Sequence, residues 1–175
     1  MTSSDTHDEA ERCFARLQEL VDLIPVYTEK DVELRRARAA RELLTLRTAA
    51  VAASAEYQRL EHECDEALRL AHDARERGDM QAEGRELGRL RTVSELCALR
   101  RAPMERAAAE LRVALAPGGL AEAAGVREDD LLLMDERLDE LALDDVAFEA
   151  LLAQIEHYKR EYAAVYARCQ ELLEA

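Results

Sequence analysis

The strongest constraint on the fold is an unbroken heptad pattern of apolar residues in the first half of the chain. Between residues 39 and 74 their spacing alternates four and three for five heptads. A 3.5-residue repeat sustained over this length is typical of helices that pack as a coiled coil. We therefore predict a helix over residues 29–77, about 73 Å long, with Thr28 as its N-cap. The heptad positions are Ala39, Leu43, Leu46, Ala50, Ala53, Tyr57, Leu60, Cys64, Ala67, Ala71 and Ala74.

A tight turn is predicted directly after this helix. Gly78 suits the left-handed position that follows a helix, and Asp79 suits the N-cap of the next one. The next helix is predicted over residues 80–116. Its expected seam consists of Leu87, Leu90, Ser94, Cys97, Arg101, Met104, Ala108, Leu111 and Leu115.

Two long helices joined by a short turn form an antiparallel hairpin. Residues at equal distances from the turn then face each other. This places Arg101 opposite Glu56 and Tyr57. We expect Arg101 to pair with Glu56 or to stack on Tyr57, and thereby to set the register.

The remaining segments also read as helices. An apolar stripe predicts a helix over residues 8–24, ended by Pro25. Residues 117–128 contain Pro and Gly and are expected to form a loop, followed by helices over 129–142 and 145–174. The stripe expected in the first helix is Ala10, Phe14, Leu17, Val21 and Ile24. The stripe expected in the last helix is Phe148, Leu151, Ile155, Tyr158, Tyr162, Val165, Cys169 and Leu172.

The composition agrees with an all-α fold, because only 6 of the 175 residues are Gly, 3 are Pro and 4% are aromatic. We predict one domain over residues 1–175, an elongated helical bundle. It is built on a long antiparallel, coiled-coil-like hairpin, and the N-terminal and C-terminal helices pack alongside.

The charge of the chain limits its partners. The net charge is −14, and residues 113–175 contain 15 acidic and 5 basic residues. Phosphate backbones and anionic lipids repel such a protein, so we expect neither a nucleic-acid nor a membrane partner. Cationic surfaces of other proteins are the favoured partners.

The expected compartment is the cytoplasm. The first ten residues have neither a basic nor an apolar region of the kind found in signal peptides. The four cysteines, Cys13, Cys64, Cys97 and Cys169, favour reduced thiols over a disulfide framework. A Cys64–Cys97 disulfide is not expected, because the hairpin places Cys64 opposite about residue 93.

No chemical motif indicates catalysis, a cofactor or a metal ion. His62 and His72 lie about 15 Å apart along a helix, too far to share one ion. No histidine follows a glutamate at the Glu-x-x-His spacing of helical di-metal sites. The chain also lacks a Gly-rich phosphate loop and a nucleophile elbow.

Two stretches of like charge are the candidate partner-docking residues. Arginines are concentrated at the start of the long helix, and ten acidic residues lie within 127–149. The two stretches either attract each other inside one bundle, which we favour, or dock partners of opposite charge. The candidates are Arg35, Arg36, Arg38, Arg41, Asp129, Asp130, Asp135 and Glu136.

The function expected from these features is that of a non-enzymatic helical interaction protein: a scaffold, an adaptor or a small chaperone. Long amphipathic helices without a convergent polar pocket favour contacts with partner helices. A homodimer is a further expected partner, since it would cover an apolar stripe left open. The alternatives are a helical sensor that binds a small ligand between helices, and a helical-bundle enzyme without a recognisable motif.

Overall fold

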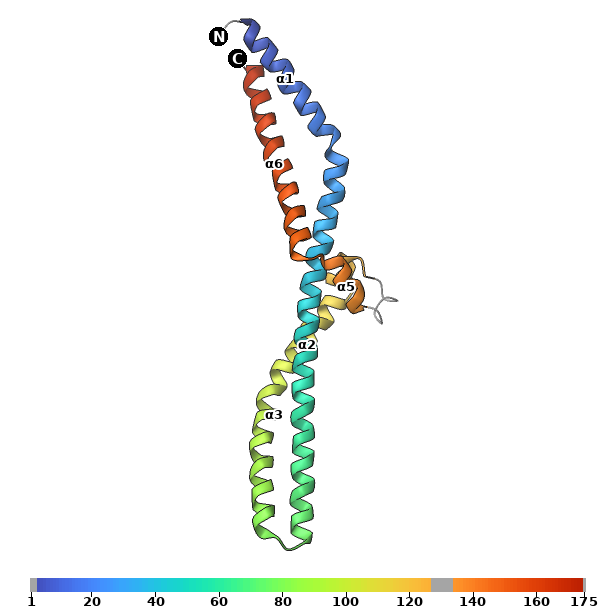
Figure 1. Ribbon diagram of the computed structural model, residues 1–175, viewed down its shortest axis with the longest axis vertical. Coiled ribbons are helices and arrows are strands. Elements are labelled where there is room, and N and C mark those ends of the chain that lie inside the picture. The colour runs from blue at the N-terminus through green and yellow to red at the C-terminus, as the bar shows by residue number, and fades with distance from the viewer. Residues whose placement is uncertain (1–2, 127–133, 175) are drawn as a thin grey trace. The chain divides into compact units, whose positions relative to one another are not determined.

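The computed structural model describes residues 3–126 and 134–174 of the chain. The prediction of an all-α bundle is confirmed, since these residues form helices and no strand. In chain order the helices are α1 (Ser3–Asp22), α2 (Ile24–Glu76), α3 (Met80–Leu115), α4 (Leu120–Ala124), α5 (Met134–Ala142) and α6 (Asp145–Glu174), as Figure 1 shows.

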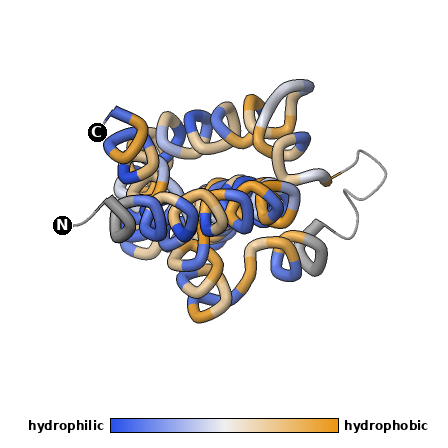
Figure 2. The backbone as a smooth tube through the Cα atoms, turned by 90° about the horizontal axis from the view of Figure 1, so that it is seen from above, coloured by the Kyte–Doolittle hydropathy of each residue, from blue (hydrophilic) through white to orange (hydrophobic). Residues whose placement is uncertain are grey.

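The helices group into two compact units. The first unit comprises Met1–Ala40 and Ala123–Ala175, and the second comprises Arg41–Glu122. Helix α2 contributes to both units. Figure 2 shows hydrophobic and hydrophilic residues alternating along the helices, as expected where each helix buries one face. That these units behave as one domain stays a prediction.

The turn of the hairpin in the second unit has the predicted geometry. Gly78 has a φ angle of 73°, the left-handed conformation that glycine adopts without a steric penalty. The carboxylate of Asp79 accepts a hydrogen bond of 2.9 Å from the backbone N–H of Ala82. The N-cap therefore satisfies one of the backbone donors exposed at the start of α3.

The antiparallel pairing of α2 and α3 is also confirmed. Two ion pairs cross the hairpin: Arg89 with Glu66 at 3.0 Å, and Arg100 with Glu56 at 3.1 Å. Within each pair, the two residues are nearly the same number of positions from the turn. All eleven predicted heptad positions of α2 are buried or half-buried. The heptad pattern therefore identified the face that α2 buries between residues 39 and 74, whereas the buried Leu34 and Ala37 lie before the pattern begins.

The face that α3 buries differs from the prediction at alternate positions. Val93 is 6% exposed and Glu86 is half-buried, whereas the predicted Leu87 and Ser94 are exposed. The buried face is therefore turned by one residue at these positions, and the predicted Arg101 is also exposed. The other six positions of the predicted seam are half-buried: Leu90, Cys97, Met104, Ala108, Leu111 and Leu115.

The boundary between the first two helices lies earlier than predicted. The break is at Leu23, whose backbone N–H bonds the carbonyl of Leu20 at 3.2 Å. Pro25 is in the first turn of α2, where a missing N–H leaves no hydrogen bond unmade. Thr28 is consequently inside the helix rather than its N-cap, and its hydroxyl donates to the carbonyl of Ile24 at 2.9 Å.

The buried face of α1 is also turned relative to the predicted stripe. Phe14 and Val21 are 41% and 39% exposed, whereas Leu20 is only 1% exposed and Cys13 is half-buried. The rotation brings Cys13 and Leu20 onto α6, where both make hydrogen bonds.

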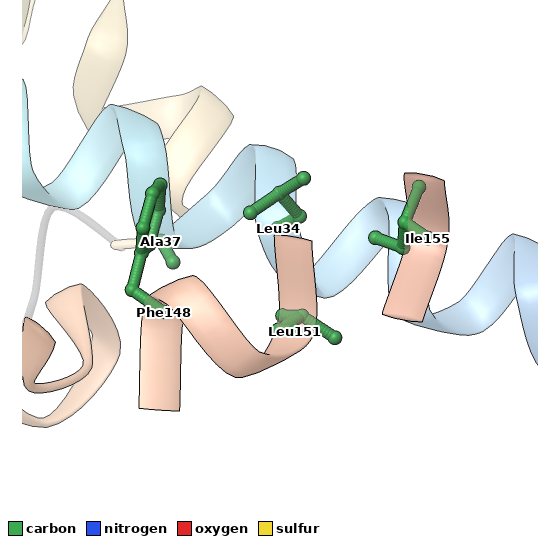
Figure 3. Close-up of a cluster of buried hydrophobic side chains, with 5 residues drawn as sticks. All are labelled: Leu34, Ala37, Phe148, Leu151 and Ile155. Atoms are coloured by element: carbon green, nitrogen blue, oxygen red, sulfur yellow. The ribbon is translucent and has the colours of Figure 1, made fainter. Parts of the chain in front are cut away.

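The first unit has its core between α2 and α6. Leu34 and Ala37 of α2 form a buried cluster with Phe148, Leu151 and Ile155 of α6 (Figure 3). The predicted stripe of α6 is confirmed in full, because every one of its eight positions is buried or half-buried.

The segment between α3 and α6 holds more helix than predicted. The expected loop over 117–128 contains α4, and the described part of the expected helix over 129–142 is α5. The last helix begins at Asp145 as predicted. Asp144 caps it by accepting a hydrogen bond of 2.7 Å from the backbone N–H of Ala147.

Candidate protein-interaction surface

The arginines of the candidate docking set differ in their surroundings. Arg35 pairs with Asp31 one turn earlier on α2. The guanidinium of Arg36 approaches Gly125, 3.9 Å from the position that a Cβ would occupy there. Arg38 is exposed, and Arg41 is half-buried at the start of the second unit.

The acidic members of that set have no described side chains. Asp129 and Asp130 lie outside the described residues, and Asp135 and Glu136 are described only as backbone positions of α5. Internal pairing of the arginine-rich and acidic stretches therefore stays a prediction.

The ion pair with Glu56 that was expected for Arg101 is made by Arg100 instead. Arg100 pairs with Glu56, and Arg101 pairs with Glu105 of its own helix at 2.8 Å. Arg101 nevertheless lies near α2, because its charge interacts with Tyr57 and Glu61 of that helix. Tyr57 is half-buried, and a hydrogen bond with Glu61 raises its pKa. A role of Arg101, Glu56 and Tyr57 in setting the register stays a prediction.

A ladder of tyrosines runs along α6 and extends onto α2. The ring centroids of Tyr27 and Tyr158 lie 4.6 Å apart, and Tyr162 and Tyr166 continue the stack at 6.3 and 6.1 Å. The ammonium of Lys159 lies 5.8 Å from the Tyr27 ring centroid, a cation–π arrangement. We call the four tyrosines, Tyr27, Tyr158, Tyr162 and Tyr166, the tyrosine ladder.

The break between α1 and α2 presents apolar side chains next to this ladder. Leu23, Ile24 and Val26 are 45%, 42% and 48% exposed. They are exposed because the chain changes direction at Leu23 and Pro25 begins a new helix. We call these three residues the apolar corner.

Two cavities lie beside the stacked rings of Tyr27 and Tyr158. One, of about 260 Å³, is lined by Leu23, Val26 and the side of α6 that bears His157 and Glu161. The other, of about 340 Å³, is lined by Ile24, Thr28, Lys159 and Tyr162. The apolar corner, the stacked tyrosine rings and the two cavities thus form one surface of the first unit. We call it the ladder surface.

Polar side chains fix the edges of the ladder surface. Lys30 donates a hydrogen bond of 2.7 Å to the side-chain oxygen of Gln154. Glu161 pairs with Arg16 of α1, and His157 lies 3.7 Å from the same carboxylate. These contacts join α1, α2 and α6, so the groove between them is already formed in the free protein.

The negative charge of the chain is concentrated in the unit that carries the ladder surface. The first unit contains 23 acidic and 11 basic residues, a net charge of −12, whereas the second contains 15 and 13, a net charge of −2. A cationic partner is therefore attracted mainly to the first unit.

The sequence pattern indicates only part of the ladder surface. Tyr158, Tyr162 and Tyr166 are spaced four residues apart, which places them on one face of a helix. Tyr158 and Tyr162 belong to the predicted apolar stripe of this helix, and Tyr166 lies outside it. Only the position of Tyr27 shows that this face continues onto α2.

The tip of the hairpin holds a third cavity, of about 460 Å³, in the second unit. It is lined by His72, Arg75 and Glu83 among others, and the last two form an ion pair of 2.8 Å. In the described part of the chain, no three His, Cys, Asp or Glu side chains gather as a metal site requires. Likewise, no described helix has the length and apolar character needed to cross a bilayer.

The hydroxyl of Tyr158 ties the ladder to the end of α1. It donates a hydrogen bond of 2.6 Å to the backbone carbonyl of Leu20. Burial, and then the neighbouring Tyr162 and Tyr27, raise the pKa of Tyr158 above its ordinary value of 10.

We expect Tyr158→Phe to lower the free energy of unfolding by about 1 kcal/mol, because Leu20 loses this donor. A phenol whose pKa is raised on folding stabilises the protein below its unfolded pKa, and this contribution is lost as pH rises through the folded pKa. Urea denaturation followed by tyrosine fluorescence should therefore show a steeper loss of stability above about pH 10 for the parent protein than for Tyr158→Phe. The control is Tyr166→Phe, because Tyr166 is 46% exposed at the end of the ladder. A control that behaves like Tyr158→Phe would contradict the assignment.

Comparison of the chain with protein-family models, with curated proteins and with solved structures finds no match.

Proposed function

We propose that the chain is a non-enzymatic helical interaction protein whose ladder surface binds a basic amphipathic helix of a partner protein. The observation that carries the proposal is the preformed apolar and aromatic groove on the unit with a net charge of −12. Helix-in-groove recognition requires apolar anchors that insert between helices, and it gains specificity from the charges around them.

The composition of the surface favours a protein partner. Tyrosine presents a large rigid area together with a hydroxyl, and it is enriched where binding energy is concentrated. The cavities beside Tyr27, of about 260 and 340 Å³, are near the lower end of the range for small-molecule sites. They match single side chains of a docked helix better than a whole ligand.

The free thiols of the chain agree with a reducing compartment such as the cytoplasm, where we place this function. A scaffold, an adaptor and a small chaperone all use such a surface. A helical sensor and a helical enzyme, the alternatives raised by the sequence, remain the competing proposals.

The proposal is tested with two labelled helical peptides of identical pattern, one of leucine and lysine and one of leucine and glutamate. In fluorescence anisotropy we expect the lysine peptide to bind at least about tenfold more tightly. Val26→Asp should reduce that binding by about tenfold or more, because it places a charge in the apolar groove.

Val51→Asp is the matched control, since Val51 is also an exposed valine of α2, 60% exposed, but lies in the second unit. Both variants add one negative charge, so only an effect on the groove separates them. Equal binding by the two variants, or equal binding of the two peptides, would contradict the proposal. A dimer in light scattering that Val26→Asp abolishes, without peptide binding, would instead assign the surface to a second copy.

A further inference from the structure

Helices α1 and α6 are joined by contacts along much of their length. Arg168 of α6 pairs with Glu9 of α1 at 2.6 Å, and Arg16 of α1 pairs with Glu161 of α6. The helices run antiparallel, as Figure 1 shows. These ion pairs hold the segment that contains Cys13 against the segment that contains Cys169.

The two thiols lie in contact next to these ion pairs, with Cys13 between Glu9 and Arg16 on α1 and Cys169 directly after Arg168 on α6. The Sγ atoms of Cys13 and Cys169 are 2.8 Å apart, and the Cys13 thiol also lies 3.6 Å from the carbonyl oxygen of Val165. Cys169 is 3% exposed, whereas Cys13 is half-buried. An external reagent therefore reaches Cys13 first, and Cys169 is placed to react with whatever forms there.

The surroundings of Cys169 keep it protonated at neutral pH. Burial, followed by the hydrogen bond with Cys13, raises the pKa of Cys169 to about 11. A thiol in this state is a poor initial nucleophile, which again assigns the first reaction to Cys13.

We propose that Cys13 and Cys169 are a reversible dithiol–disulfide pair that glutathione disulfide oxidises, linking α1 covalently to α6. The Cys13 thiolate attacks one sulfur of glutathione disulfide and expels one glutathione thiolate, which leaves a mixed disulfide on Cys13. Cys169 then gives up its proton, attacks the Cys13 sulfur and expels the second glutathione. The two cysteines together lose two protons and two electrons, and one glutathione disulfide becomes two glutathione thiols.

The inference does not depend on the proposed function. In a reducing compartment the pair remains a dithiol, and it closes only when glutathione disulfide accumulates. Closure fixes α1 on α6, the two helices that hold the edge of the ladder surface through Arg16 and Glu161.

A second cysteine pair in the chain serves as the internal comparison. Cys64 of α2 and Cys97 of α3 have Sγ atoms 3.8 Å apart, and Cys64 is also 3.7 Å from the hydroxyl oxygen of Ser94. Cys64 thus lies next to Ser94, close to the expected position opposite residue 93, and Cys97 lies nearer to Cys64 than expected because it is one turn from Ser94 on the same face of α3. Both cysteines are free thiols. This pair lies in the second unit, so Cys64→Ala/Cys97→Ala leaves the first unit unchanged.

The test is oxidation of the folded, full-length chain with excess glutathione disulfide. Remaining thiols are blocked with N-ethylmaleimide, and peptides are mapped by mass spectrometry without reduction. We expect a Cys13–Cys169 disulfide in both the parent chain and Cys64→Ala/Cys97→Ala. The melting temperature should rise by at least about 5 °C and return on addition of dithiothreitol, because the bond closes a long loop of the unfolded chain.

Cys13→Ala and Cys169→Ala should each abolish this rise. Since Cys169 is buried, its variant can lose stability for reasons of packing, and Cys13→Ala is the variant that decides. Glutathione that stays on Cys13, or a disulfide between two chains instead of within one, would overturn the proposal. A rise in melting temperature that persists in Cys13→Ala when Cys64→Ala/Cys97→Ala is also present would do the same.

Discussion

We expect Leu151→Ala to lower the free energy of unfolding of the first unit by about 3 kcal/mol, because truncating a buried leucine leaves its site partly empty. Leu151 is 7% exposed and lies in the cluster with Leu34, Ala37, Phe148 and Ile155. This cluster joins α2 to α6, so its loss weakens the framework that supports the tyrosine ladder.

Chemical denaturation followed by tyrosine fluorescence measures this effect selectively. The chain has no Trp and five Tyr, and all except Tyr57 lie in the first unit. The control is Leu173→Ala on the same helix, since Leu173 is 71% exposed and its truncation should change stability by less than about 0.5 kcal/mol. Similar losses for the two variants would show that the cluster is not the core of this unit.

Glycine-to-alanine substitutions in the hairpin should raise the stability of the second unit at some positions and lower it at another. Gly84 and Gly88 lie inside α3, and no atom lies within 4 Å of the position that a Cβ would take at either residue. Each change to alanine should stabilise the second unit by about 0.5–1 kcal/mol, because alanine loses less backbone entropy on forming a helix. The double variant should gain about 1–2 kcal/mol.

Gly78→Ala should lower the free energy of unfolding, in contrast to the substitutions at Gly84 and Gly88. Its surroundings are equally open, but its φ angle of 73° should make alanine destabilising by about 1–2 kcal/mol. Amide hydrogen exchange of α3 distinguishes the variants: protection should rise in Gly84→Ala/Gly88→Ala and fall in Gly78→Ala. Loss of protection in the double variant would mean that another helix packs against these two glycines.

The parts of the fold that local chemistry controls could be read from the sequence. The position of the hairpin turn follows from Gly78 and Asp79, whose conformational and hydrogen-bonding preferences act within one turn of helix. The start of α6 follows in the same way from the carboxylate of Asp144. The buried faces of α2 and α6 were also predictable, because their heptads contain one apolar stripe without a competitor.

The errors occurred where two stripes compete. In α1, Phe14 and Val21 fit a heptad as well as Cys13 and Leu20 do. In α3, Leu87 and Ser94 compete with Glu86 and Val93, and each pair offers only one apolar residue. Period alone does not rank such alternatives. In α1 the residues that form hydrogen bonds with α6 are Cys13 and Leu20, which belong to the buried stripe. Their partners, Cys169 and Tyr158, are more than 130 positions away in the sequence.

By itself the sequence determined that this chain is helical, where its hairpin turns, and which faces of α2 and α6 are buried, because these depend on contacts within a few residues. The tertiary structure alone decided the rotation of α1 and α3, and with it the meeting of Cys13 with Cys169 and of Arg100 with Glu56. It also decided that Tyr27 extends the tyrosines of α6 into a surface. Such pairings depend on where distant segments come together, and a periodic pattern of apolar residues specifies a buried face without naming the residues that lie opposite it.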